Sequence, residues 1–313
     1  MKKKIAFLFP GQGSQSVGMG HEFYKEYDFV REIFDMAEEI TRINLSRLCF
    51  KGPMETLTET VNLQPAVTAV NLACLAIIKK EGLSPFVSAG HSLGEYSALC
   101  SSGVITREDT ISLVYRRGKV MHRESLKNKG AMSAVIGLSI DEVSEVVASV
   151  QREGIVAVAN HNAEKQIVIT GSPEQVGKVG LLVSEKKARA IPLKVSGAWH
   201  SELIKGAEVE FVDFLDRFSF NKPASSIVLN VTGDFADNPA EILSIMAKQL
   251  CSPVKWYDTI QSMIAERIEI FIEAGPGKVL TGLLKKNLPK DYPCQIFNVN
   301  NMKSVDKLFN TIL

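Results

Sequence analysis

The stretch Val87-Ser-Ala-Gly-His-Ser-Leu-Gly-Glu-Tyr-Ser-Ala98 is the part of the sequence from which the rest of the fold can be interpreted. Its first residues, with Pro85 and Phe86 before them, predict a short buried strand. Glu95 to Cys100 predict a helix that begins with an acidic residue, which the helix dipole favours. Between the two lies a G-x-S-x-G turn centred on Ser92, whose glycines let strand and helix approach closely while the serine hydroxyl is exposed. We therefore predict a nucleophilic serine, against the alternative of a tight turn with an idle one.

The composition is that of an ordinary globular protein. The chain has 313 residues, of which 45% are hydrophobic and 23% charged, and its net charge is +1. This small net charge argues against nucleic-acid binding as the main role. The five cysteines are scattered and none lies in C-x-x-C spacing, which predicts reduced thiols without a disulfide framework or a metal site. The apolar run Ile5 to Phe9 is too short for a signal peptide, and we expect no membrane span and a cytoplasmic protein.

A glycine-rich loop follows the first predicted strand. Ile5 to Phe9 is a continuous apolar run, which is typical of a strand buried on both faces of a parallel sheet. The loop Pro10-Gly-Gln-Gly-Ser-Gln-Ser-Val-Gly-Met-Gly20 matches no nucleotide motif, because the third dinucleotide glycine would fall on Ser16 and no G-K-[ST] follows. It does place backbone N–H groups at the carboxyl end of a strand, where α/β sheets bind ligands, with Gln12 at its tip. A flexible turn is the alternative.

Two predicted helices flank the predicted strand and the G-x-S-x-G turn at Ser92, which we call the elbow. We expect the first to span Pro65 to Lys80, since proline is favoured in the first helical turn. Thr106, with Asp109 three residues later, predicts a capping box at the start of the second. Arg117 lies on the apolar stripe of this second helix, whereas Arg116 lies on its polar side. A buried guanidinium needs an anion, and the pattern leaves open whether this is an internal carboxylate or that of a substrate.

Residues 130–195 have a different pattern from the rest of the chain. Strands and helices alternate there in the order β-α-β-β-α-β, which is that of ferredoxin-like domains. We therefore predict that a small domain, residues 129–195, is inserted into a larger one formed by residues 1–128 and 196–313. The strands are expected at 131–137, 155–160, 166–170 and 189–195, and the helices at 141–151 and from 172.

His200 is the histidine best placed to act as a general base. It follows a predicted strand and stands at the head of a helix expected from Glu202, a junction at which sheets present reactive groups. The other histidines lie within predicted helices or the small domain, except His91, which we expect to support the turn at Ser92. Beyond this point we expect strands at 227–231 and 268–273, and helices at 239–249, 257–266 and after the loop 275–280.

Several motifs follow one another along the chain: Phe9-Pro-Gly-Gln-Gly-Ser-Gln15, Leu63-Gln-Pro-Ala66, Gly90-His-Ser-Leu-Gly-Glu-Tyr96, Arg116-Arg-Gly118, Gly197-Ala-Trp-His-Ser201, Gln249-Leu250 with Pro253-Val254, and Gly275-Pro-Gly-Lys-Val-Leu280. In these motifs the sequence resembles the malonyl-CoA:acyl-carrier-protein transacylases and, more broadly, the acyltransferase domains of fatty-acid and polyketide synthases. The resemblance spans nearly the whole chain. It implies an α/β fold, with a hydrolase-like large domain around a mostly parallel sheet and an inserted ferredoxin-like α+β domain.

The resemblance also implies roles for the reactive groups. Ser92 would be the nucleophile and His200 its base. The family has no triad acid, and the backbone carbonyl of Gln249 would orient the histidine instead. The backbone N–H groups of Gln12 and Leu93 would form the oxyanion hole.

Four side chains are expected to bind the substrate. The resemblance implies that Arg117 takes the malonyl carboxylate, which favours a substrate over an internal partner. Asn160 matches a family position near the acyl pocket, and Gln64 belongs to the L-Q-P-A motif. Trp199 stands where the family more often has Phe or a smaller residue, so we expect it to narrow the pocket against α-branched acyl groups such as methylmalonyl.

The function so implied is transfer of malonyl from malonyl-CoA to the phosphopantetheine thiol of acyl carrier protein, through a malonyl-Ser92 ester and ping-pong steps. It would supply extender units for fatty-acid synthesis. We expect no cofactor, no metal and a monomer. An acidic carrier protein would dock on a basic pair, Lys285-Lys286 or Lys186-Lys187, although both pairs are also consistent with solvated helix faces.

Three alternatives stay open. The first is a discrete acyltransferase of a polyketide or polyunsaturated-fatty-acid synthase. The second is a proofreading acyl hydrolase on the same scaffold, against which Arg117 argues, because removal of non-malonyl groups would not use a carboxylate clamp. The third is a non-catalytic module that docks carrier protein, against which the joint presence of Ser92, His200 and Arg117 argues.

Overall fold

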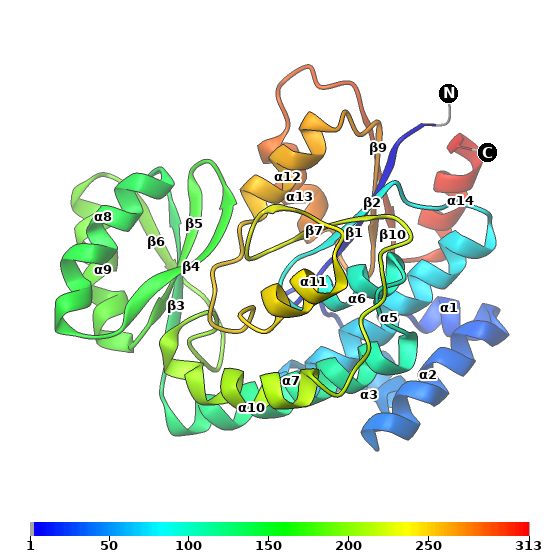
Figure 1. Cartoon of the computed structure of the whole chain (residues 1–313), viewed down its shortest axis with the longest axis horizontal. Helices are drawn as coiled ribbons and strands as arrows, with labels where there is room; N and C mark the ends of the chain where they lie inside the picture. The colour runs from blue at the N-terminus through cyan, green and yellow to red at the C-terminus, as the bar shows by residue number, and fades with distance from the viewer. Residues whose placement is uncertain (1–2, 313) are drawn as a thin grey trace.

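The computed structural model describes residues 3–312 and consists of two sheets with the helices that cover them (Figure 1). The larger sheet has the strand order β10-β9-β1-β2-β7-β8. Neighbouring strands pair in parallel, except β7 and β8, which are antiparallel. This mostly parallel sheet confirms the predicted fold class. Its strands are β1 (Ile5–Phe9), β2 (Val87–Gly90), β7 (Ser226–Leu229), β8 (Asp234–Ala236), β9 (Ile270–Ala274) and β10 (Gln295–Val299).

The central strands are buried on both faces. In β1, Phe7 and Phe9 pack into the apolar core on one face, whereas Ala6 and Leu8 pack into the core on the other, because successive side chains of a strand point to opposite sides. Helices α12 (Trp256–Ala265) and α13 (Val279–Asn287) cover the second face. The core on the first face includes residues of α1 (His21–Glu26), α2 (Asp28–Thr41), α3 (Leu45–Lys51), α4 (Met54–Thr58), α5 (Thr60–Lys80), α6 (Gly94–Ser101), α7 (Arg107–Lys127), α10 (Lys205–Leu215), α11 (Pro239–Met246) and α14 (Met302–Ile312).

Helix α5 begins five residues earlier than predicted, at Thr60, so that Pro65 lies inside it. The backbone N–H groups of Asn62 and Leu63 both bond to the Glu59 carbonyl and start the helix there, while Pro65 removes only one internal bond. By length and composition alone, α5 could cross a membrane, since one window of it has a mean hydropathy of 1.7. However, 89% of that window is buried inside the protein. The apolar composition therefore reflects a core helix packed between the sheet and α7.

The second sheet is antiparallel and has the order β4-β5-β3-β6, the ferredoxin-like arrangement that the order of elements predicted. Helices α8 (Ile140–Val150) and α9 (Pro173–Glu185) cover one face around a separate apolar core. The segments entering and leaving this unit touch, because a Cβ on Gly130 would clash with the backbone of Ala198. On this basis we propose that residues 129–195 form an inserted domain. The strands are β3 (Ala131–Ile136), β4 (Val156–Ala163), β5 (Gln166–Gly171) and β6 (Arg189–Pro192).

Some elements differ from the predictions at their ends. Strand β6 ends at Pro192 rather than at residue 195, because the chain turns and the Val195 N–H bonds back to the Leu193 carbonyl at 3.0 Å. Helix α11 ends at Met246 rather than at residue 249, where the last bonds tighten to three-residue spacing. The helix after His200 begins as a short 3-10 turn, residues 202–204, before α10. Strands β8 and β10 and helices α2, α3, α4 and α14 were not predicted.

Glycines allow the first loop, the elbow and α6 to pack against β1. A Cβ on Gly94 would clash with the carbonyl oxygen of Phe9, and a Cβ on Gly90 would clash with the backbone of Gly94. A Cβ on Gly11 would lie 2.5 Å from the His91 carbonyl oxygen. All these neighbours are backbone atoms, which cannot rotate away. The spacing of glycines in both motifs is therefore a packing requirement.

Replacing Gly94 by alanine should lower the free energy of unfolding by about 3 kcal/mol or more, because the added methyl group forces α6 away from β1. Chemical denaturation monitored by circular dichroism measures the change. The matched control is Gly177→Ala in the middle of α9, where nothing lies within 4 Å of the new Cβ. That variant should be as stable as the parent or more stable by up to about 1 kcal/mol, since alanine favours helix. Equal stability of the two variants would contradict the packing argument.

Candidate active site

Ser92 occupies a strained turn between β2 and α6. Its φ is 50°, in the left-handed region that residues other than glycine adopt at a cost of about 1–2 kcal/mol. Two side chains from distant segments hold the turn. The Asn230 Oδ1 accepts the Ser92 N–H at 2.7 Å, and the Gln249 Nε2 donates to the Ser92 carbonyl at 2.8 Å. The serine hydroxyl is thereby held clear of the strand, as a nucleophile requires.

His200 lies against Ser92. Its Nε2 is 2.8 Å from the Ser92 Oγ, and its Nδ1 is 2.9 Å from the Ser252 carbonyl oxygen and 3.1 Å from that of Gln249. Carbonyl oxygens only accept hydrogen bonds, so the proton resides on Nδ1 and Nε2 is free to accept from the serine hydroxyl. Main-chain carbonyls thus take the place of the carboxylate of a triad. The Ser252 contact was not predicted, because a backbone acceptor leaves no mark in the sequence.

The surroundings of His200 keep its imidazole neutral. Burial, followed by the positive charge of Arg117 and then His91, lowers the pKa of His200 from 6.5 to about 3. The hydrogen bonds to the carbonyls of Ser252 and Gln249 oppose this shift only in part. The ring is therefore uncharged at neutral pH and can accept a proton.

Arg117 is buried beside this pair without an acidic partner. The residue lies on α7 and is 1% exposed. Its Nη2 donates to the Ser92 Oγ at 3.1 Å and its Nε donates to the Gln249 Oε1 at 3.2 Å. Among residues 3–312, no carboxylate lies within ion-pair distance of the guanidinium. Of the two alternatives that the pattern left open, an internal ion pair is therefore absent from the described chain, and the guanidinium faces the serine.

These three residues line one cavity of about 210 Å³ between α7 and α13 on one side and the second sheet on the other. Trp199 and Asn160 also line it and are 5% and 6% exposed. The remaining walls are mainly apolar and include Met121, Met132, Val168, Leu280 and Leu283. The cavity therefore combines a polar reactive end with walls that exclude water.

Gln12 and Leu93 border the same cavity. Gly11 brings the first loop against the elbow, since a Cβ on it would lie 3.5 Å from the Leu93 nitrogen. Neither the Gln12 nor the Leu93 N–H has an acceptor within the described residues. Both are therefore available to an incoming oxyanion, and their use in catalysis stays a prediction.

Glu95 and Asn230 belong to this site, although sequence reasoning missed them. We expected Glu95 to be a first-turn residue favoured by the helix dipole, but it is fully buried and accepts hydrogen bonds from the Asn230 N–H and the Gln249 side chain. Asn230 also donates to the Gly90 carbonyl at 2.8 Å. The position of Glu95 one helical turn after Ser92 is a signal that could have been used. Asn230 offered none, since it lies 138 residues from Ser92.

Gln64 does not line the cavity, contrary to expectation. It is 1% exposed on α5, where its Nε2 lies 3.3 Å from the Met121 Sδ and its Cβ faces Gly118. Met121 itself lines the cavity. Gln64 therefore supports the cavity wall from behind, because the register of α5 directs it toward α7.

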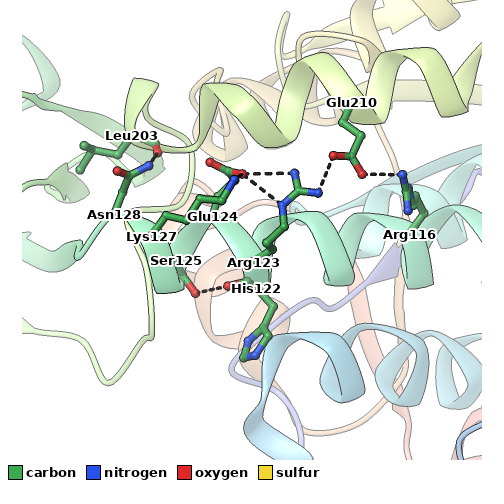
Figure 2. A network of polar contacts seen from close by, with 9 residues as sticks. All are labelled: Arg116, His122, Arg123, Glu124, Ser125, Lys127, Asn128, Leu203 and Glu210. Atoms are coloured by element: carbon green, nitrogen blue, oxygen red, sulfur yellow. Dashed lines mark hydrogen bonds and ion pairs between the residues drawn. The ribbon is translucent and has the colours of Figure 1, made fainter.

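A network of ion pairs joins α10 to α7 (Figure 2). Glu210 on α10 pairs with Arg116 and, at 2.5 Å, with Arg123, both on α7. Each pair is partly exposed and contributes about 0–1 kcal/mol. The network holds the helix that follows His200 against the helix that carries Arg117. Arg116 is thus on the polar side of α7, as predicted.

Residues 6–307 match the family model described as an acyl transferase domain. The chain belongs to this family. It is similar to the malonyl CoA-acyl carrier protein transacylase of Bacillus subtilis (strain 168), with 42% identity over 285 residues, or 90% of each chain. An acyl carrier protein S-malonyltransferase from Vibrio cholerae O1 biovar eltor superposes with a TM-score of 0.92 at 38% identity, over 98% of this chain and 100% of the other. A malonyl-transacylase solved in complex with its type II polyketide-synthase acyl-carrier protein has a TM-score of 0.93 at 34% identity, with the same coverage.

We expect His200 of this acyltransferase to remain unprotonated at pH 5, whereas in the unfolded chain the ring titrates near its ordinary pKa of about 6.5. Ring-nitrogen chemical shifts in NMR spectra measured as a function of pH test this. In the Arg117→Met variant the pKa of His200 should rise. The positive charge of Arg117, which is the second-largest cause of the lowered pKa, is then removed, while burial persists. A titration near pH 6.5 in the folded parent enzyme would contradict the assigned environment.

Proposed function

We propose that this acyltransferase transfers malonyl from malonyl-CoA to the phosphopantetheine thiol of acyl carrier protein and so supplies extender units for fatty-acid synthesis. The observation that carries the proposal is a buried guanidinium that has no acidic partner among residues 3–312 and lies 3.1 Å from the hydroxyl of Ser92. In a malonyl thioester a single methylene group separates the carboxylate from the reacting carbonyl. A cationic group that binds this carboxylate must therefore lie next to the nucleophile, as Arg117 does. The names of the relatives point to the same substrates.

In the first half-reaction, the Ser92 Oγ attacks the thioester carbonyl while its proton passes to His200 Nε2, 2.8 Å away. The developing oxyanion accepts hydrogen bonds from the backbone N–H groups of Gln12 and Leu93, and loss of one such donor typically slows a step about 10²–10³-fold. The C–S bond then breaks, and the thiolate of coenzyme A takes the proton from His200. A malonyl-Ser92 ester remains.

In the second half-reaction the phosphopantetheine thiol is the nucleophile and the Ser92 oxygen is the leaving group. The phosphopantetheine thiol gives its proton to His200 Nε2 and attacks the ester carbonyl, and the same two N–H groups stabilise the oxyanion. The C–O bond breaks, and the Ser92 oxygen recovers its proton from His200. The malonyl thioester of the carrier protein leaves a regenerated enzyme.

The walls of the cavity select the acyl group. The malonyl carboxylate pairs with the Arg117 guanidinium and supplies a direct ionic partner, which no carboxylate of the described residues provides. Trp199 narrows the space beside the reacting carbon and disfavours a methyl branch there. Asn160 supplies a polar group on the side of the second sheet.

Acyl transfer between thioesters involves no redox change, and we propose no cofactor beyond the two substrates. Every group in the mechanism comes from one chain, which supports a monomer. We place the enzyme in the cytoplasm on the basis of the reduced cysteines that the sequence predicts.

A polyketide-synthase role is the second candidate, and one of the similar structures favours it, because its partner is a type II polyketide-synthase carrier protein. The chemistry and the residues would be the same. The two candidates differ only in which carrier protein removes the malonyl group.

The test is to incubate the purified enzyme separately with malonyl-, methylmalonyl- and acetyl-CoA and to measure the mass of the intact protein. We expect a malonyl adduct that maps to Ser92 and clears when phosphopantetheinylated carrier protein is added, while the Ser92→Ala control forms none. Methylmalonyl-CoA should react more slowly because of Trp199. An adduct lost to water as fast as to carrier protein would indicate the hydrolase, and no adduct at all would indicate a docking module.

We place the carrier-protein surface at Lys285-Lys286 rather than at Lys186-Lys187. The Lys286 Nζ donates to the Gln166 Oε1 at 2.7 Å, and Gln166 lines the cavity. The pair Lys186-Lys187 follows α9, which packs on one face of the second sheet (Figure 1), whereas the cavity-lining Met132 and Val168 belong to the core on the other face. An acidic partner seated on the end of α13 could thus reach Ser92 with its pantetheine arm.

Lys285→Glu should raise the KM for carrier protein roughly tenfold, because the reversed charge repels an acidic surface. The matched control, Lys186→Glu, carries the same change of charge and should leave this KM within a factor of two of the parent. Steady-state transfer assays at low and high salt measure both, and the effect of Lys285→Glu should shrink as salt screens it. An equal effect in the control would refute the docking site, and a larger rise in the KM for malonyl-CoA would assign the pair to coenzyme A.

A further inference from the structure

Glu95 is a buried carboxylate that none of the chemical steps uses. It is 0% exposed, and both of its oxygens accept hydrogen bonds, one from the Asn230 N–H at 2.6 Å and one from the Gln249 Nε2 at 2.7 Å. Burial raises the pKa of Glu95 to about 7, while these bonds and the charge of Arg117 lower it in part. Both partners are donors, so the contacts favour the ionised carboxylate.

The Gln249 side chain connects Glu95 to Arg117. Its Oε1 accepts the Arg117 Nε–H at 3.2 Å and the Tyr96 hydroxyl at 3.4 Å. Its Nε2 donates to Glu95 and, at 2.8 Å, to the Ser92 carbonyl. An amide has two donor hydrogens and two acceptor lone pairs, so its capacity is filled.

Only one orientation of this amide satisfies both neighbours. An ionised carboxylate accepts and never donates, whereas a guanidinium donates and never accepts. A rotated amide would place Oε1 against Glu95 and Nε2 against the Nε–H of Arg117, with repulsion at both ends. The carboxylate of Glu95 thus determines which face of Gln249 meets the arginine.

The contact with Gln249 determines in turn how Arg117 is used. The Gln249 Oε1 accepts the Nε–H of the guanidinium, so the two Nη groups remain for other partners. Of these, Nη2 donates to the Ser92 Oγ. Given the proposed function, on which this inference rests, the Nη groups are the ones that meet the malonyl carboxylate. We propose that Glu95 is a positioning residue for malonyl selectivity, which acts through the Gln249 side-chain amide to orient the Arg117 guanidinium toward Ser92.

Orientation and charge make opposite predictions for the loss of this carboxylate. If the negative charge alone mattered, its removal would strengthen the attraction of Arg117 for an anionic substrate. If orientation matters, removal frees the Gln249 amide to rotate and weakens the binding of malonyl. The sign of the change in selectivity therefore separates the two roles.

The experiment compares the parent enzyme with Glu95→Gln, which keeps shape and removes charge. The rate of acyl-Ser92 formation is measured with malonyl-CoA and with acetyl-CoA, whose acyl group lacks the carboxylate. We expect KM for malonyl-CoA to rise, and the malonyl-to-acetyl ratio of kcat/KM to fall about tenfold, which corresponds to the loss of one hydrogen bond to a charged group. An equal loss for both substrates would mean that Glu95 only supports the elbow. A higher ratio would mean that its charge dominates. Either result overturns the proposal.

A double-mutant cycle tests whether the effect passes through Arg117. In the Arg117→Met background, adding Glu95→Gln should leave the malonyl-to-acetyl ratio unchanged, because no guanidinium remains to be oriented. A further fall of the ratio in that background would overturn the proposal.

Gln249→Met keeps the experiment decisive if Glu95→Gln fails to fold. This variant removes the amide but retains the main-chain carbonyl that faces His200. It should lower the malonyl-to-acetyl ratio as Glu95→Gln does, and an unchanged ratio would overturn the proposal. The parent enzyme is measured first: no malonyl adduct there refutes the proposed function, whereas an adduct with an unaltered ratio in the variants refutes only the role of Glu95.

Discussion

In water a guanidinium keeps a hydration shell, and at Arg117, which is 1% exposed, the protein has to replace that shell. A buried charge costs several kcal/mol unless hydrogen bonds and opposite charge compensate for it. The compensation comes from hydrogen bonds to the Ser92 hydroxyl and the Gln249 amide. The Glu95 carboxylate is hydrogen-bonded to the other end of that amide. The same positive charge lowers the pKa of His200 and so helps to keep the base neutral. The charge of Arg117 thus serves both the choice of acyl group and the neutrality of the base.

Much of this site follows from short-range patterns in the sequence. The glycines around Ser92 predict the elbow, and the helical period places Arg117 on a buried face. Glu95 and Asn230 were missed because their roles depend on contacts between residues 135 positions apart. Gln64 was misplaced because a motif shared with a family shows that a residue is needed, but not which surface it faces.

The same division holds for the fold. Central strands such as β1 are apolar along their whole length and can be recognised, whereas β8 and β10 are edge strands with partly exposed residues and carry a weak signal. The start of α5 was misjudged because a proline normally marks the first turn of a helix. There the tertiary packing of an apolar helix outweighs the loss of one hydrogen bond at Pro65.

The segment that orients His200 also pairs with β4 of the second sheet. Two residues beyond Ser252, the Val254 N–H donates to the Ala159 carbonyl at 2.8 Å, and the Val254 carbonyl accepts the His161 N–H at 2.9 Å. Every amino acid supplies the same main-chain carbonyl, so an exchange of side chain at Ser252 cannot delete the acceptor, whereas a triad carboxylate is one codon change from loss. Alanine scanning would not reveal these acceptors, because alanine retains the main-chain carbonyl. The orientation of the base is thus robust to sequence drift, but it is sensitive to any displacement of the second sheet.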